Sequence, residues 1–190
     1  MSFRQLWELA KMSKILITAF EPFGLIRGKL LNKNASKEVI DLVKDNLIHD
    51  ANFEIISVNA QGEKLLCDKL NSYKPTGVIC MGENLLQHGS SIHIEPYAID
   101  SPVSTLTLGG INKIERSSFA EYAIEKFNQT QDSKIGTYYC NRAYLCSLRW
   151  CEANGSRPVV FVHVPVSGSR NVHGKQILKL VSLMKSYLNN

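Results

Sequence analysis

Three residues that lie far apart in the chain, Cys140, His163 and Glu95, are of the types that a thiol hydrolase uses. A cysteine nucleophile needs a base to take its proton and usually a third group to orient that base. Each residue also has an ordinary structural interpretation: a cysteine packed at a helix start, a hydrogen-bonded histidine at the edge of the core, and a carboxylate that faces water from a strand. The spacing of the three residues does not decide between these interpretations.

Cys140 lies where a short β-like run gives way to an amphipathic pattern. Apolar residues recur there at three-to-four spacing, which predicts a helix that buries one face: Tyr144, Leu145, Leu148 and Cys151. Backbone N–H groups without intrahelical partners gather at the start of a helix, where the macrodipole also favours an anion. The thiol of Cys140 is therefore expected to lose its proton more readily than an ordinary cysteine.

Apolar runs and amphipathic segments alternate along the chain, which indicates a sheet covered by helices. Strands are predicted over residues 14–20, 54–58, 77–82, 91–99 and 159–164, and helices over residues 34–43, 64–70, 119–127, 140–151 and 176–188, with a loop over residues 21–33. His163 lies near the end of an apolar strand, and functional sites gather at the carboxyl ends of strands in α/β sheets. The predicted fold class is α/β, a single three-layer α/β/α domain with a twisted, mostly parallel, mixed central sheet.

The composition sets the remaining bounds. At 190 residues and 44% hydrophobic composition, the chain can bury one sizeable core, which we assign to residues 13–190, with residues 1–12 as an N-terminal extension. The formal charge of +5 comes from scattered lysines and arginines, so we expect no nucleic-acid partner. No apolar run reaches the length of a membrane span and no secretory signal is recognisable, so we expect a cytoplasmic protein without a membrane partner.

The five cysteines lack CxxC spacing, which argues against a structural zinc site or a disulfide framework and favours a reducing compartment. Apart from Cys140, they are expected to be small buried hydrophobic residues: Cys67, Cys80, Cys146 and Cys151. His93 shares a strand face with Glu95, but no HxH or HExxH spacing supports a metal site, so no metal and no cofactor are predicted. The other histidines are expected at the surface or in loops: His49, His88 and His173.

Five segments resemble the pyroglutamyl peptidase I family, the pyrrolidone-carboxylate peptidases. They are similar to the family's first strand and its Gly-Phe-(Asp/Glu)-Pro-Phe-Gly loop, to its Asn-Pro-Ser-x-Glu-Ala, and to the stretches around its catalytic glutamate, cysteine and histidine. In this chain the segments are residues 14–24, KILITAFEPFG; 34–39, NASKEV; 94–100, IEPYAID; 136–141, GTYYCN; and 161–165, FVHVP. Any one match is weak, whereas five matches in family order are a specific signal.

The resemblance implies a cysteine peptidase (an omega peptidase) that hydrolyses the amide bond after an N-terminal pyroglutamyl residue. Cys140 would be the nucleophile, His163 the acid and base, and Glu95 the group that holds the imidazole. The resemblance also implies four substrate-binding residues. Phe20 and Phe23 match the loop phenylalanines that would clasp the flat lactam ring, Tyr138 matches another ring-contacting position, and Glu83 stands where the family has a glutamine near the substrate. The implied partners are N-terminally pyroglutamylated peptides, and because the family often assembles as dimers or tetramers, a homo-oligomer is a further expectation.

The chain departs from the family pattern around the lactam-binding positions. Residues 82–88 read GENLLQH where the family has Gly-Gln-Ala-Gly-Gly-Arg, Pro96 replaces an arginine, and the segment after Asp100 lacks the family's Arg-x-Pro-Asn/Asp-Asn-x-Gly stretch. A site with different hydrogen-bond partners can reject a substrate by orders of magnitude. Two alternatives therefore stand beside the peptidase: a divergent thiol amidase acting on another small cyclic or N-terminal amide, and a non-catalytic binding protein with an idle triad.

Overall fold

The computed structural model describes residues 14–23, 25–26, 29–30, 32–100, 113–131, 135 and 138–189. The predicted N-terminal extension, residues 1–12, lies outside the described residues. So do three parts of the family-like segments: Gly24, Gly136 and Thr137, together with the divergent segment after Asp100, residues 101–112.

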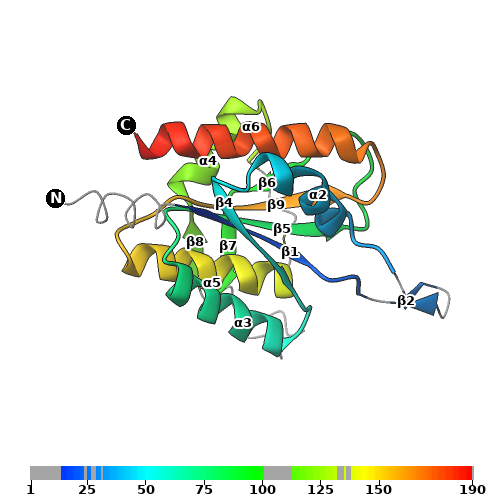
Figure 1. Ribbon diagram of the computed structural model, residues 1–190, viewed down its shortest axis with the longest axis horizontal. Coiled ribbons are helices and arrows are strands. Elements are labelled where there is room, and N and C mark those ends of the chain that lie inside the picture. Colours follow the sequence, from blue (N-terminus) through cyan, green and yellow to red (C-terminus); the bar gives the residue numbers. More distant parts are fainter. Residues whose placement is uncertain are drawn as a thin grey trace.

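A five-stranded sheet forms the centre of the molecule (Figure 1). Four strands run parallel to one another and one edge strand runs antiparallel to its neighbour, so the predicted mixed, mostly parallel sheet is confirmed. In spatial order the strands are β4 (Ala51–Ile56), β1 (Ile15–Phe20), β5 (Val78–Asn84), β9 (Val159–Pro165) and the antiparallel β6 (His93–Glu95). Strands β1 and β9 are buried along their whole length, as their continuous apolar runs predict.

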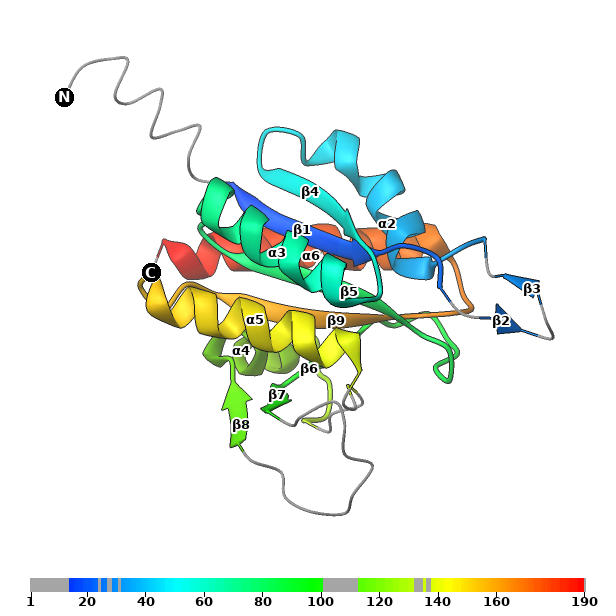
Figure 2. The same cartoon turned by 90° about the horizontal axis from the view of Figure 1, so that it is seen from below.

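Helices cover both faces of this sheet and complete the predicted three layers (Figures 1 and 2). One apolar core lies between the sheet and α2 (Ala35–Val43), α4 (Ser118–Lys126) and α6 (Arg170–Leu188). The second core lies between the opposite face and α3 (Ala60–Tyr73) and α5 (Tyr139–Ala153). Side-chain caps start three of the helices, because Asn34, Asn59 and Ser117 each accept a hydrogen bond from a backbone N–H in the first turn.

Two small antiparallel ladders and a 3-10 turn, η1 (Lys44–Asn46), complete the described secondary structure. The strand predicted over residues 91–99 is two strands, β6 and β7 (Tyr97–Asp100), separated at Pro96, which has no backbone N–H to donate to a ladder. β7 pairs with β8 (Lys113–Arg116), which the sequence did not predict. The predicted loop over residues 21–33 holds a short hairpin, β2 (Leu25–Ile26) with β3 (Lys29–Leu30).

Three predictions of burial were wrong. His173 is fully buried and not at the surface. Helix α6 starts at Arg170, earlier than predicted, and His173 lies in its first turns, which pack inward. Cys80 and Cys151 are buried as predicted. Cys67 on α3 and Cys146 on α5 are only half-buried, because they lie beside the buried stripe of their helices rather than on it.

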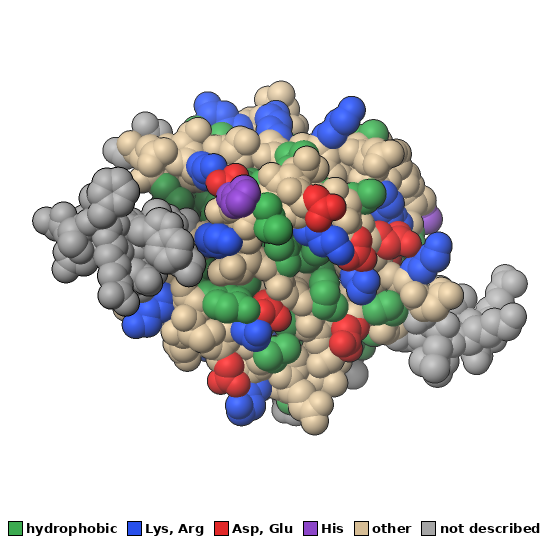
Figure 3. Space-filling view, viewed as in Figure 1, with side chains coloured by type: hydrophobic (Ala, Val, Ile, Leu, Met, Phe, Trp, Pro, Cys, Tyr) green, Lys and Arg blue, Asp and Glu red, His purple; other side chains and the backbone are tan. Residues whose placement is uncertain are grey.

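The surface shows two further features. On the face that Figure 3 shows, basic and acidic side chains are interspersed. Within the described ranges, no helix combines the length and apolarity that a membrane crossing requires.

Candidate active site

The carboxyl end of the sheet brings the predicted residues to one face. In β9, Phe161 and His163 alternate with valines, and Phe161 belongs to the core beneath α3 and α5, so His163 faces that side. The antiparallel β6 pairs His93 with His163 and Glu95 with Phe161. Side chains of directly opposed residues share a face, so Glu95 also lies on the α5 side of the sheet.

His163 and Glu95 form a short buried hydrogen bond. Nδ1 of His163 lies 2.6 Å from Oε1 of Glu95, and the two residues expose 4% and 0% of their surface. A carboxylate at this nitrogen fixes the ring orientation and, in a neutral imidazole, leaves Nε2 as the acceptor nitrogen. The backbone of Glu95 is also held, because the Tyr144 hydroxyl on α5 donates to its carbonyl oxygen at 3.1 Å.

Cys140 approaches this pair from the first turn of α5. The helix starts at Tyr139 after an N-cap residue, Tyr138, whose side chain makes no cap hydrogen bond. A Cβ built on Gly82 would lie only 2.9 Å from the Cys140 sulfur and 2.9 Å from Cζ of Phe161. Gly82 of β5 is paired with His163 of β9, and neighbouring strands lie about 5 Å apart. The thiol of Cys140 therefore packs against the strand that adjoins the one carrying the imidazole. Only a residue without a side chain at position 82 permits this approach.

The expectation that the helix start acidifies Cys140 was wrong for this resting structure. Burial raises the pKa of the Cys140 thiol to about 12, and the nearby Glu95 carboxylate acts in the same direction. A hydrogen bond from its own backbone N–H lowers the pKa, as predicted, but by less. The magnitudes explain the outcome, because a helix N-terminus contributes about 0.3–2 kcal/mol, roughly 1.5 pKa units at most, whereas burial shifts a pKa by up to about 3–5 units.

Two residues that sequence reasoning did not assign a role also build this site. The Asn141 side chain, buried, accepts from the Ile99 N–H at 2.7 Å and donates to the Ile99 carbonyl at 2.6 Å, which fastens the start of α5 to β7. His93, also buried, lies with Nε2 3.8 Å from Oε1 of Glu95, so two imidazoles flank one carboxylate. A polar residue in the first turn of an amphipathic helix was the available signal for Asn141.

The four predicted substrate-binding residues lie in different surroundings. Phe20, at the end of β1, is buried in the core beneath α3 and α5, whereas Phe23, in the following loop, is half-exposed. Tyr138 is 79% exposed at the start of α5. Glu83 points to the opposite side of the sheet, where its Oε2 accepts from the Ala35 N–H of α2 at 2.6 Å. Burial raises the pKa of Glu83 above its usual range.

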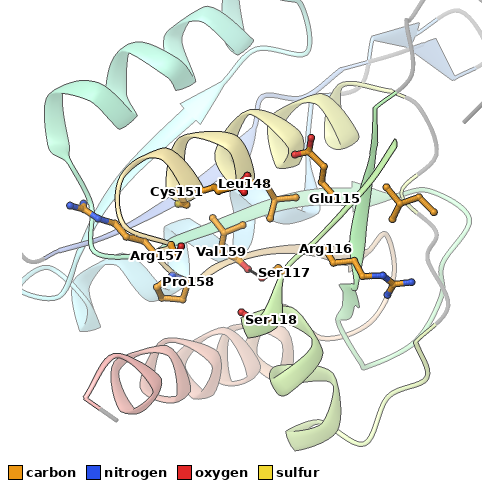
Figure 4. A pocket seen from close by; sticks show the side chains of 12 residues that line it. Glu115, Arg116, Ser117, Ser118, Leu148, Cys151, Arg157, Pro158 and Val159 are labelled. Atoms are coloured by element: carbon orange, nitrogen blue, oxygen red, sulfur yellow. Dashed lines mark hydrogen bonds between the residues drawn. The ribbon is translucent and has the colours of Figure 1, made fainter. Parts of the chain in front are cut away.

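A cavity of about 350 Å³ opens at the far end of α5 (Figure 4). Its lining includes Cys151 and Leu148 of α5, Glu115 and Arg116 of β8, and Val159 at the start of β9. Cys151 lies three helical turns beyond Cys140, ~16 Å along the helix axis, so this cavity is separate from the His163–Glu95 pair. Among the described residues, no group of three or more His, Cys, Asp and Glu side chains is arranged to hold a metal ion.

Comparisons with solved structures identify the fold, although no protein-family profile and no curated protein sequence matches the chain. A pyrrolidone carboxyl peptidase from Thermococcus litoralis superposes with a TM-score of 0.75 at 20% identity, over 93% of this chain and 95% of its own. An E192I mutant of the Pyrococcus furiosus pyrrolidone carboxyl peptidase gives 0.74 at 18% identity, over 92% and 99%. The pyroglutamyl peptidase I of Bacillus amyloliquefaciens gives 0.69 at 19% identity, over 90% and 94%. The chain therefore has the pyroglutamyl peptidase I fold along nearly its whole length, in a sequence that has diverged far from these neighbours.

Proposed function

We propose that this protein is a cysteine peptidase of pyroglutamyl-peptidase type, with Cys140 as nucleophile, His163 as general base and acid, and Glu95 as the residue that orients His163. The observation that carries the proposal is the buried His163–Glu95 hydrogen bond at 2.6 Å. The Cys140 thiol packs against Gly82, which is the neighbour of His163 on the adjacent strand. Nucleophile, base and orienting carboxylate are the three groups that acyl transfer by a thiol requires.

The raised pKa of Cys140 determines the order of proton transfers in the proposed mechanism. The resting thiol is neutral, so His163 takes its proton as the sulfur attacks the substrate carbonyl carbon. The imidazolium, stabilised by the Glu95 carboxylate, then protonates the departing amine as the C–N bond breaks. In the second half, His163 takes a proton from water as that water attacks the thioester carbonyl, and returns a proton to the Cys140 sulfur as it leaves.

Backbone N–H groups at the start of α5 are the proposed donors to the oxyanion. The first N–H groups of a helix have no intrahelical acceptor, and this helix start has no side-chain cap to occupy them. An oxyanion forms next to the attacking sulfur, so the N–H groups adjacent to Cys140 lie at the right end of the helix. Each well-aligned donor contributes roughly 3 kcal/mol to transition-state stabilisation.

The proposed substrate is a peptide with an N-terminal pyroglutamyl residue. The named activity of the structural neighbours supports this choice, together with Phe23, a half-exposed aromatic residue in the loop that follows β1. A flat aromatic side chain is suited to a flat lactam ring, to which it offers apolar contact. Phe20 is buried in the core and lies behind this loop rather than at the surface.

One observation favours a second candidate, a thiol amidase with the same triad and a different small amide as substrate. Glu83 occupies the position of a glutamine that lies near the substrate in the family that the sequence resembles. Here its carboxylate accepts from the Ala35 N–H, on the side of the sheet away from Cys140. A pocket without that lactam partner is expected to bind pyroglutamate less tightly, because polar groups of the substrate would lose their hydrogen bonds.

The proposal is tested by the release of a fluorescent amine from a pyroglutamyl-amide substrate under reducing conditions. Wild-type protein is compared with Cys140→Ser and with the matched control Cys151→Ala, a buried cysteine at the far end of the same helix. We expect turnover in the wild type and the control, and its loss in Cys140→Ser with an unchanged melting temperature. Turnover that survives Cys140→Ser would refute the mechanism. If the wild type lacks turnover on this substrate but hydrolyses another small amide in a Cys140-dependent way, the amidase is correct. If a panel of amides gives no turnover, the site is an idle one in a binding protein.

A further inference from the structure

Helices α3 and α5 lie side by side on one face of the sheet (Figure 2), and two side-chain contacts fix their register. Near their starts, an Arg142 guanidinium nitrogen lies 2.5 Å from a carboxylate oxygen of Glu63. Two turns later, Nε1 of Trp150 donates to Oδ1 of Asn71 at 2.9 Å. The second contact lies two turns after the first on both helices, so α3 and α5 run parallel and face each other residue by residue.

Cys67 and Cys146 occupy the position midway between these two contacts. Each cysteine lies one turn after the Glu63–Arg142 pair and one turn before the Asn71–Trp150 pair on its own helix. The flanking contacts place the two thiols side by side, close enough that each affects the ionisation of the other. Both residues are half-buried, so small solutes can reach them. The flanking contacts hold the helices together on either side of the thiol pair.

We propose that Cys67 and Cys146 are an oxidative modification site, a dithiol that a peroxide converts reversibly into a disulfide linking α3 to α5. The Cys67 thiolate attacks one oxygen of the peroxide, the O–O bond breaks, and the released hydroxide takes up a proton to become water. The Cys146 sulfur then attacks the sulfur of the resulting Cys67 sulfenic acid, and a second water leaves with the Cys146 proton. Two thiols lose two electrons in total, and hydrogen peroxide is reduced to two waters.

The ionisation of the cysteines favours this pair as the first to react. The hydrogen bond between the thiols lowers the pKa of Cys67 and raises that of Cys146, so the pair loses one proton readily and the second reluctantly. Burial and the negative charges of Glu63 and Asp68 act against ionisation of Cys67, but by less than the hydrogen bond. Burial raises the pKa of Cys80, Cys140 and Cys151, which makes these thiols slower to react with a peroxide.

The site requires only the packing of α3 against α5, so it does not rest on the proposed peptidase activity. It is nevertheless linked in the structure to the candidate active site, because Cys140 is in the first turn of the same α5 helix that carries Cys146. A disulfide at Cys146 would fasten that helix covalently to α3. The half-buried position is typical of a reducible regulatory disulfide rather than a structural one.

Trypsin separates the cysteines concerned, which makes the test direct. It cuts after lysine and arginine, so Cys67 falls in residues 65–69 (LLCDK), Cys146 in 143–149 (AYLCSLR), Cys140 in 135–142 and Cys151 beyond Arg149. Folded protein is treated with hydrogen peroxide, denatured, alkylated and digested without reductant. We expect loss of two of the five free thiols and a linked peptide joining 65–69 to 143–149, which dithiothreitol separates again.

Matched variants decide the assignment. Cys67→Ser and Cys146→Ser should each abolish the linked peptide, whereas Cys151→Ala and Cys140→Ser should retain it. The Cys140→Ser result also separates this proposal from the peptidase, since that variant lacks the proposed nucleophile and keeps the thiol pair. Linkage of either cysteine to a different thiol, or oxidation of Cys67 to a sulfinic acid in the wild type without any linkage to Cys146, would overturn the proposal.

Discussion

A single added methyl group at Gly82 would test the geometry of the candidate site. In Gly82→Ala, the new Cβ would lie 2.9 Å from the Cys140 sulfur and 2.9 Å from Cζ of Phe161, where ordinary contacts begin at 3.4 Å. The Phe161 ring is fully buried and packs against the rings of Tyr144 and His163, at centroid distances of 5.9 and 5.1 Å, so it has little room to yield. The thiol must therefore move away from the strand that adjoins His163, by about 0.5 Å or more.

The expected losses follow from this displacement. Overpacking a buried position costs about 1–3 kcal/mol, and at this chain length each kcal/mol lowers the melting temperature by about 2–4 °C. A misplacement of about 1 Å at a reacting group can lower a rate by about 10²-fold, so we expect turnover to fall on the order of 10- to 100-fold. The change in kcat should exceed the change in KM, because the thiol acts in the chemical step.

Gly77→Ala is the matched control. Gly77 directly precedes the same strand, at its opposite end, and a Cβ there would meet the Met184 sulfur at 2.6 Å and the Pro158 carbonyl oxygen at 3.1 Å. It should lower the melting temperature to a similar extent and leave the turnover of the folded protein near the wild-type value. Thermal unfolding and amine release are measured on all three proteins. Full activity in Gly82→Ala, or an equal loss in both variants, would refute the packing of Cys140 against Gly82 beside His163.

Three further predictions concern ionisable groups. Glu95→Gln should lower kcat by roughly 10³–10⁴-fold with little change in KM, since an amide cannot stabilise the His163 imidazolium; steady-state kinetics near the wild-type rate would contradict this. The folded-state pKa of Glu83 is raised by burial, so its ionisation opposes folding as pH rises above the unfolded value near 4.5. Glu83→Gln should therefore gain melting temperature over the wild type at pH 7 but not at pH 4, and a pH-independent difference would count against it. Alkylation of Cys140, whose pKa is about 12, should accelerate about tenfold per pH unit between pH 7 and 10 and stay slower than that of Cys67 at neutral pH, as peptide mass spectrometry can follow.

The elements that the sequence predicted well are those with long, unambiguous apolar patterns. The continuous runs at β1 and β9 and the amphipathic pattern of α5 led to elements with nearly the predicted bounds. The four-residue strand β8, with its charged sequence KIER, carries no such pattern, and its ladder with β7 joins segments that are distant along the chain. The first turns of α6 are polar and glycine-containing, so the periodicity became visible only after the true start of that helix.

In the candidate site, too, the sequence predicted what depends on short local segments and missed what depends on contacts between distant segments. Cys140, His163 and Glu95 could be named from the sequence, because short segments around each resemble a known family. Their surroundings could not be derived in that way. The Glu83 bond to α2 and the Cys67–Cys146 contact both depend on how helices settle on the sheet, and residue spacing carries no information about that packing.

The raised pKa of Cys140 alters the role that the α5 N-terminus can have in catalysis. With its pKa raised to about 12, the thiol of Cys140 is neutral near pH 7, so the proposed mechanism starts from the thiol and not from a preformed thiolate. The N–H groups at the helix start, too weak to offset burial of the thiolate, keep their full effect on the oxyanion, which forms only after attack. In the proposed mechanism, proton transfer from the thiol to His163 therefore accompanies the attack. The 2.6 Å contact with Glu95 matters in that step, because the carboxylate would stabilise the charge that the imidazole acquires.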